Sequence, residues 1–164
     1  MRILASSLLF LLPLAAADKH PWGSFKAGSY AKLKTTMNAG PTKMVTEVTQ
    51  TLVSVDANNA VVEMETKAMG QTSKTKVPMP LKSTAPTTAP QGKPLTPTNE
   101  TITVAGKAIA CKCYDIETNA NGMKSVTHSC TSESVPGAVV RSVTKSTGAM
   151  KSETVTELVE FAAK

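Results

Sequence analysis

Apolar and polar residues alternate along most of the chain with a period of two, the pattern of a β-strand with one buried face. Thr and Val recur in these stretches, and their branched side chains suit a pleated surface. Turn signals interrupt the alternation at short intervals. We therefore predict strands over residues 28–37, 43–55, 60–69, 71–77, 100–105, 107–118, 123–132, 138–146 and 149–161.

Asn and Gly mark the turns between these strands. The dipeptides at 58–59, 105–106 and 147–148 each separate two alternating runs, and Asn121-Gly122 is the strongest two-residue hairpin signal in the chain. Strands joined by such short turns pair antiparallel. We expect an all-β protein, built as a single antiparallel meander sheet that is curved or forms a half-barrel.

Residues 1–17 have the parts of a secretory signal peptide. Arg2 is followed by an apolar run over 3–14, and the small residues at 15–17 predict cleavage after Ala17. The apolar run is too short to span a bilayer as a helix, and no longer one follows it. We expect a secreted or periplasmic protein with no transmembrane span after signal removal, in which residues 18–164 form one domain.

Proline is frequent in one segment, residues 78–98, which reads PMPLKSTAPTTAPQGKPLTPT. Proline has no backbone N–H to donate, so this segment cannot be an inner strand. It predicts an extended, flexible loop inserted between two halves of the sheet. The alternative is a spacer that extends from the domain.

The charge and the aromatic content exclude one class of partner. The formal net charge is +6, and removing Arg2 with the signal lowers it to +5, while aromatic residues make up only 4% of the chain. Nucleic-acid binding needs clustered Arg and Lys with stacking aromatics, whereas these lysines are spread out among Thr, Ser and Val. We expect no nucleic-acid partner. A core of small aliphatic side chains also favours one sheet wrapped on itself over a deep globule.

The stretch CKCYDIETNANGMKSVTHSC, residues 111–130, contains every cysteine of the chain. A two-residue turn at 121–122 places Cys113 opposite Cys130, and a four-residue loop places Cys111 there instead. Either pair lies at a non-hydrogen-bonded position, within reach of a disulfide. In an oxidising compartment we therefore expect Cys130 to bond with Cys113 or Cys111, leaving one odd thiol.

In both registers Cys111, Cys113, His128 and Cys130 share one strand face. These are ligand types for zinc or copper, which makes a metal site an alternative interpretation. The usual Cys-x-x-Cys spacing is missing, so the disulfide is the favoured prediction and no metal or other cofactor is expected.

A nucleophilic Cys113 with His128 and Asp115 in reach is a further alternative. No helix N-terminus or Gly-rich loop nearby offers oxyanion donors, and the chain has no phosphate loop, Gly-x-Ser-x-Gly or His-Glu-x-x-His motif. We predict no catalytic residues and no enzymatic activity.

Three segments carry a resemblance to known proteins. HPWGSFKAGSY at 20–30, the strand with Cys111 and Tyr114, and SVPGAVVRS at 134–142 resemble an uncharacterised group of small secreted bacterial proteins. The all-β layout is also similar, at the level of fold, to the half-barrel of periplasmic lipoprotein carriers. That similarity implies a curved sheet that shields an apolar concavity for lipid chains.

Our first functional hypothesis is a non-enzymatic envelope protein that binds a lipid or another hydrophobic ligand. Val, Leu and Met on one face of 43–69 would line the site, and an apolar concavity of roughly 300 Å³ or more would support it. The alternatives are a structural or adhesive envelope protein, cross-linked through the odd thiol, and a Cys/His metal-binding domain. The sequence predicts no oligomeric state.

Overall fold

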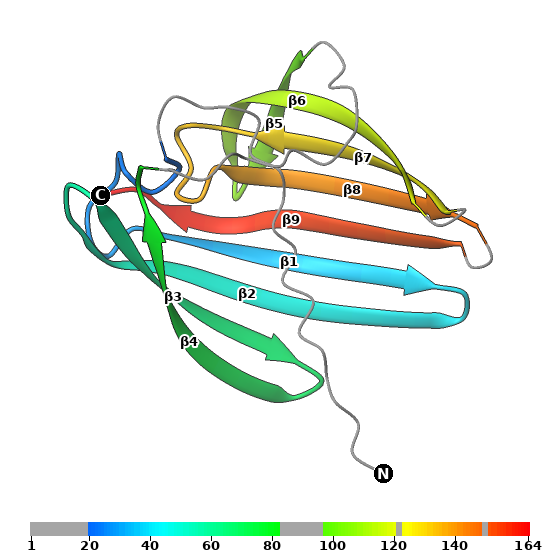
Figure 1. Cartoon of the computed structure of the whole chain (residues 1–164), viewed down its shortest axis with the longest axis horizontal. Coiled ribbons are helices and arrows are strands. Elements are labelled where there is room, and N and C mark those ends of the chain that lie inside the picture. Colours follow the sequence, from blue (N-terminus) through cyan, green and yellow to red (C-terminus); the bar gives the residue numbers. More distant parts are fainter. Residues whose placement is uncertain (1–19, 83–96, 121–122, 149–150) are drawn as a thin grey trace.

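Within the described residues of the computed structural model, nine antiparallel strands form one sheet (Figure 1). The structure describes residues 20–82, 97–120, 123–148 and 151–164. Because those residues contain no helix, they include none that could cross a membrane. The strands are β1 (Tyr30–Ala39), β2 (Thr42–Val55), β3 (Asn59–Ala68), β4 (Gln71–Pro80), β5 (Thr98–Val104), β6 (Lys107–Ala120), β7 (Met123–Thr131), β8 (Val139–Thr147) and β9 (Ser152–Ala162).

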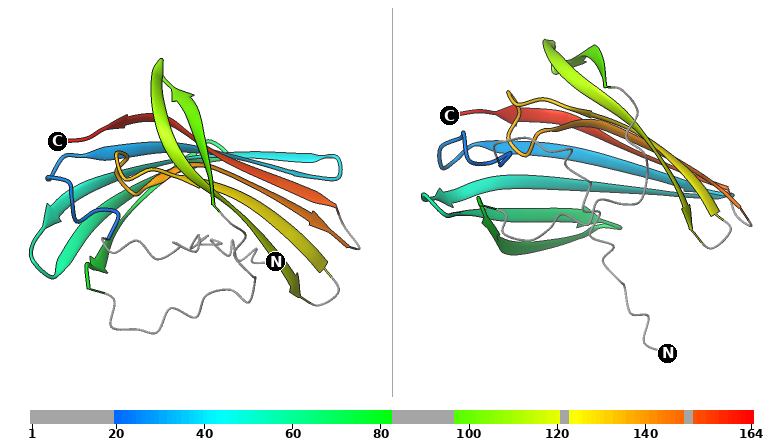
Figure 2. Two further views of the ribbon diagram at one scale, coloured as in Figure 1. Left: turned by 90° about the horizontal axis from the view of Figure 1, so that it is seen from above. Right: turned by 45° about the horizontal axis from the view of Figure 1, so that its top comes forward.

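The sheet joins two meanders, and its strand order is β4-β3-β2-β1-β9-β8-β7-β6-β5. The first and last strands, β1 and β9, pair in the middle, and β4 and β5 are the two edges. Figure 2 shows the sheet arched, with β5 and β6 turned away from the plane of the middle strands. The prediction of an all-β protein with a single curved antiparallel sheet is confirmed, and the sheet formed by the described residues is not closed into a barrel.

Each predicted strand is present, and the largest correction concerns the proline segment. The predicted loop over 78–98 is wrong at both ends, because β4 continues to Pro80 and β5 begins at Thr98. An edge strand tolerates proline because one row of its backbone groups has no ladder partner. The middle of that segment, 83–96, and the predicted signal peptide with its cleavage site at Ala17 lie outside the described residues.

Two clusters of buried side chains hold the sheet. One is shared by β1 and β5–β9, and the other covers the β2–β3 end. In the second cluster Leu52 and Val62 are 0% exposed and pack with Trp22. Fully burying an aliphatic side chain contributes about 1.5–3 kcal/mol.

Trp22 also packs the segment 20–30 against the segment 134–142, two of the three segments that carry the resemblance. Gly137 has a φ of 76°, and a Cβ placed on it would lie 3.0 Å from the Trp22 ring. The Gly137 N–H donates to the Pro21 carbonyl at 3.3 Å. These two motifs therefore form a packing contact at one end of the sheet.

Candidate functional site

The β6–β7 hairpin adopts the register of the two-residue turn, which places Cys113 opposite Cys130 and Asp115 opposite His128. Cys113 and Cys130 form a disulfide, so the choice between the two predicted pairings is resolved in favour of Cys113. The bonded cysteines are 1% and 0% exposed. The turn residues 121–122 lie outside the described ranges.

Cys111 is the remaining thiol, and it is buried. It is 4% exposed, and its Sγ donates to the Ile109 carbonyl at 3.5 Å. Burial raises the pKa of the Cys111 thiol above its ordinary value. A bond to a second chain through Cys111 would require this part of the sheet to open, so the geometry does not favour the adhesive alternative.

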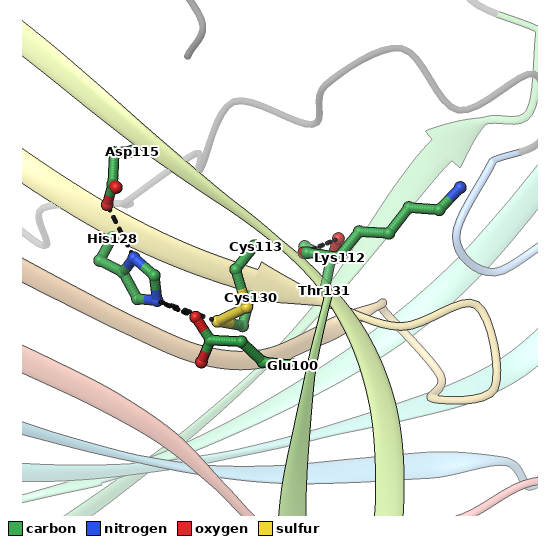
Figure 3. A network of polar contacts seen from close by, with 7 residues as sticks. All are labelled: Glu100, Lys112, Cys113, Asp115, His128, Cys130 and Thr131. Atoms are coloured by element: carbon green, nitrogen blue, oxygen red, sulfur yellow. Dashed lines mark hydrogen bonds and ion pairs between the residues drawn. A yellow bond between two sulfur atoms is a disulfide. The ribbon is translucent and has the colours of Figure 1, made fainter. Parts of the chain in front are cut away.

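His128 is the centre of a polar cluster built by three strands (Figure 3). Its Nδ1 lies 2.7 Å from Asp115 Oδ1 in β6. Its Nε2 lies 3.3 Å from Glu100 Oε1 in β5 and 3.4 Å from Sγ of Cys130, two residues along β7. The imidazole therefore bridges two carboxylates and touches the disulfide.

The metal-ligand group differs from the predicted one. Ligand atoms of Glu100, Cys113, His128 and Cys130 all lie within 4.8 Å of one another. The prediction of Cys111 in this group is wrong, because its thiol points to the Ile109 carbonyl, and Glu100 takes its place. With Cys113 and Cys130 bonded to each other, neither sulfur is a thiolate that can bind a metal ion.

Glu100 is the residue that the sequence interpretation missed. It faces Cys111 across the β5–β6 ladder, while Val104 faces Lys107 over a two-residue turn. Applying that turn at 105–106 to set the register would have placed Glu100 on the face of the cysteines. This turn is the sequence signal that could have found it.

The Cys–His–Asp arrangement is present with a different sulfur. His128 contacts Cys130, not the predicted Cys113, and Asp115 orients the other ring nitrogen. The sulfur belongs to a buried disulfide, so this arrangement presents no nucleophilic thiol. The absence of enzymatic activity stays a prediction.

A depression of about 320 Å³ lies over β7 and β8, beside His128. Cross-strand pairing puts its lining on one face of the sheet, because His128 faces Val143 and Val126 faces Lys145. Two valines and three basic side chains line it: Val126, His128, Arg141, Val143 and Lys145. The depression is therefore amphipathic.

The apolar lining predicted over 43–69 is closed at its most buried residues. Leu52 and Val62 are 0% exposed and pack in the second cluster with Trp22, Phe25 and Met79. These two side chains offer no surface to a ligand, so the expectation that they line an open concavity is wrong.

Comparison with protein families, with curated proteins and with solved structures found no match. The resemblance to small secreted bacterial proteins and to lipoprotein carriers stays a prediction.

Proposed function

We propose that the protein is a secreted or periplasmic, non-enzymatic binding protein, and that its ligand is an anionic amphiphile with an alkyl chain and a carboxylate. The observation that carries this proposal is the 320 Å³ depression, which combines two valines with three basic side chains. Its volume is within the range of about 300–1,000 Å³ of small-molecule sites. The Cys113–Cys130 disulfide is compatible with an oxidising compartment.

The apolar half of the site is provided by neighbouring strands. Val126 is 39% exposed and Val143 is partly buried, so both have apolar surface left to cover. Each methylene group of a ligand that this surface removes from water contributes about 0.8 kcal/mol. A short alkyl chain lying along β7 and β8 would gain several such increments.

The charged half is provided by Arg141 and Lys145, which lie beside the imidazole of His128. Arg141 pairs with Glu157 at 3.5 Å and Lys145 with Glu153 at 3.6 Å, and all four side chains are at least 42% exposed. Exposed ion pairs of this kind contribute about 0–1 kcal/mol each. A ligand carboxylate can therefore replace either glutamate at little cost, and arginine can bind it with two parallel hydrogen bonds.

Calorimetric titration with three ligands of equal chain length tests the proposal: dodecanoate and dodecylammonium below their micellar concentrations, and dodecanol below its solubility limit. We expect dodecanoate to bind at least about tenfold more tightly than dodecanol, a difference of about 1.4 kcal/mol, and dodecylammonium to bind most weakly. Dodecylammonium binding as tightly as dodecanoate, or no saturable binding of dodecanoate, would overturn the proposal.

Variants separate the two halves of the site. Arg141→Gln/Lys145→Gln is expected to reduce dodecanoate affinity to that of dodecanol, and Val143→Thr to weaken both ligands. Lys67→Gln/Lys74→Gln is the matched control, because it also removes two positive charges: both lysines pair with Glu65, at 3.2 and 2.8 Å, in the β3–β4 hairpin at an edge of the sheet. An equal loss in this control would mean that net charge alone drives binding, which contradicts the proposed site.

A further inference from the structure

We propose that the Cys113–Cys130 disulfide gates a metal site. When a dithiol reductant opens the disulfide, one Zn²⁺ ion binds to four side chains of the β5–β6–β7 face: Glu100, Cys113, His128 and Cys130. This inference does not rest on the proposed amphiphile binding, since it concerns another ligand and the reduced protein, although both sites include His128.

The distances around His128 already suit a tetrahedral ion. Zinc bonds of about 2.0–2.3 Å to nitrogen, oxygen and sulfur place neighbouring ligand atoms about 3.3–3.8 Å apart. His128 Nε2 lies 3.3 Å from Glu100 Oε1 and 3.4 Å from Cys130 Sγ. The only large change required is the separation of the two sulfur atoms from bonding distance to about 3.8 Å, which rotation of the cysteine side chains can supply.

Asp115 fixes the imidazole in the orientation that a metal ion needs. Its Oδ1 lies 2.7 Å from His128 Nδ1. When Nδ1 carries the proton of a neutral imidazole and donates it to Asp115, the Nε2 lone pair is free to bind an ion held by the sulfurs and Glu100. A carboxylate behind a metal-binding histidine sets its tautomer and raises its basicity. Asp115 is thus a positioning residue and not a ligand.

The surroundings suit the charge and the access of the ion. Two thiolates and the Glu100 carboxylate would exceed the charge of Zn²⁺ by one, and Arg141 lies directly opposite Cys130 in β8. The cysteines are buried, while the side chains of His128 and Glu100 are 34% and 45% exposed. The sulfur ligands are therefore shielded, and the ion reaches them from the His128–Glu100 side.

Zinc binding requires two steps, reduction of the disulfide and then coordination of the ion. The dithiol transfers two electrons and two protons, so the Cys113–Cys130 bond breaks, two thiols form, and the reductant becomes a disulfide. Zn²⁺ then binds both sulfurs as thiolates, and their two protons pass to solvent. Oxidation by another disulfide reverses the sequence and releases the ion.

Cobalt(II) binding to the full mature chain tests the inference, with zinc displacement and elemental analysis as second readouts. The protein is reduced with a dithiol, which is then removed under nitrogen. We expect the reduced protein to bind one equivalent of Co²⁺ with the visible absorption of a tetrahedral thiolate site, and zinc to abolish that absorption. The oxidised protein should bind none.

Four variants assign the ligands, with far-UV circular dichroism as the check of folding. His128→Ala and Cys113→Ala/Cys130→Ala should lose the tetrahedral spectrum, and Asp115→Asn should bind Co²⁺ with the same spectrum but about 10–100-fold more weakly. Cys111→Ala is the matched control and should bind like wild type. Binding of less than about a tenth of an equivalent by the reduced wild type, an octahedral spectrum, or loss of binding in Cys111→Ala would overturn the assignment.

Discussion

Removing the Cys113–Cys130 disulfide is expected to lower the free energy of unfolding by about 3 kcal/mol. The bonded residues have a sequence separation of 17, and closing a loop of this length restricts the unfolded chain by about 3 kcal/mol. Both cysteines are at most 1% exposed, so Cys113→Ala/Cys130→Ala is preferable to serine, which would bury two unpaired hydroxyls. For a domain of this size the loss corresponds to a fall in Tm of about 6–12 °C.

Urea unfolding in metal-free buffer, followed by far-UV circular dichroism with and without a dithiol, measures this effect. Reduction should cost the wild type about 3 kcal/mol and leave Cys113→Ala/Cys130→Ala unchanged. Cys111→Ala is the matched control, because Cys111 is also buried but forms no disulfide; this variant should respond to reduction like the wild type. A wild-type response below about 1 kcal/mol, or a response in the double variant, would refute the reasoning.

Three further predictions test other parts of the structure. Leu52→Ala should lower the free energy of unfolding by about 2–5 kcal/mol, because Leu52 is 0% exposed. Val53 is 41% exposed, so Val53→Ala should lower it by less than about 1 kcal/mol. A similar loss in both variants, measured by urea unfolding, would contradict the burial of Leu52 in the second cluster. Asp56 Oδ1 accepts hydrogen bonds from two backbone N–H groups of the β2–β3 turn, at 2.7 and 2.8 Å, and these bonds lower the pKa of Asp56. The carboxylate therefore stabilises the fold above the ordinary aspartate pKa, and this stabilisation is lost as the pH falls through the lowered pKa. Asp56→Asn should remove that part of the acid destabilisation, and unfolding curves that keep the wild-type pH dependence would contradict it. The exported chain should begin at Asp18, and an intact mass that retains residues 1–17 would exclude the predicted cleavage.

The local parts of the fold were predictable because short turns determine them. A two-residue turn at 121–122 predicted one of the two registers that the sequence left open, and the structure has its pairing of Cys113 with Cys130. Alternation predicted each strand to within a few residues. The pairing of β1 with β9 has no local signal, since it joins the two ends of the domain. Such pairing depends on burial across the whole sheet.

The candidate site was only partly predictable for the same reason. Cross-strand neighbours of His128 follow from one hairpin, which is why Asp115 was expected beside it. Glu100 is in β5 and contacts His128 in β7 across the intervening strand β6. Its position therefore depends on the β5–β6 register, on the β6–β7 register and on the curvature of β5 and β6. The burial of Leu52 depends on Trp22, which precedes β1 and packs on the β2–β3 end of the sheet, a contact for which the sequence has no local signal.

Disulfide mapping by mass spectrometry tests the central claim, the chemistry of the β6–β7 face, most directly. Lys112 separates Cys111 from Cys113, and Lys124 separates Cys113 from Cys130, so trypsin puts each cysteine in its own peptide. Without reduction, we expect the peptides 113–124 and 125–141 to be cross-linked, and Cys111 to be alkylated only after denaturation. A cross-link from Cys111 to Cys130, or three free thiols in protein taken from its own compartment, would contradict the account.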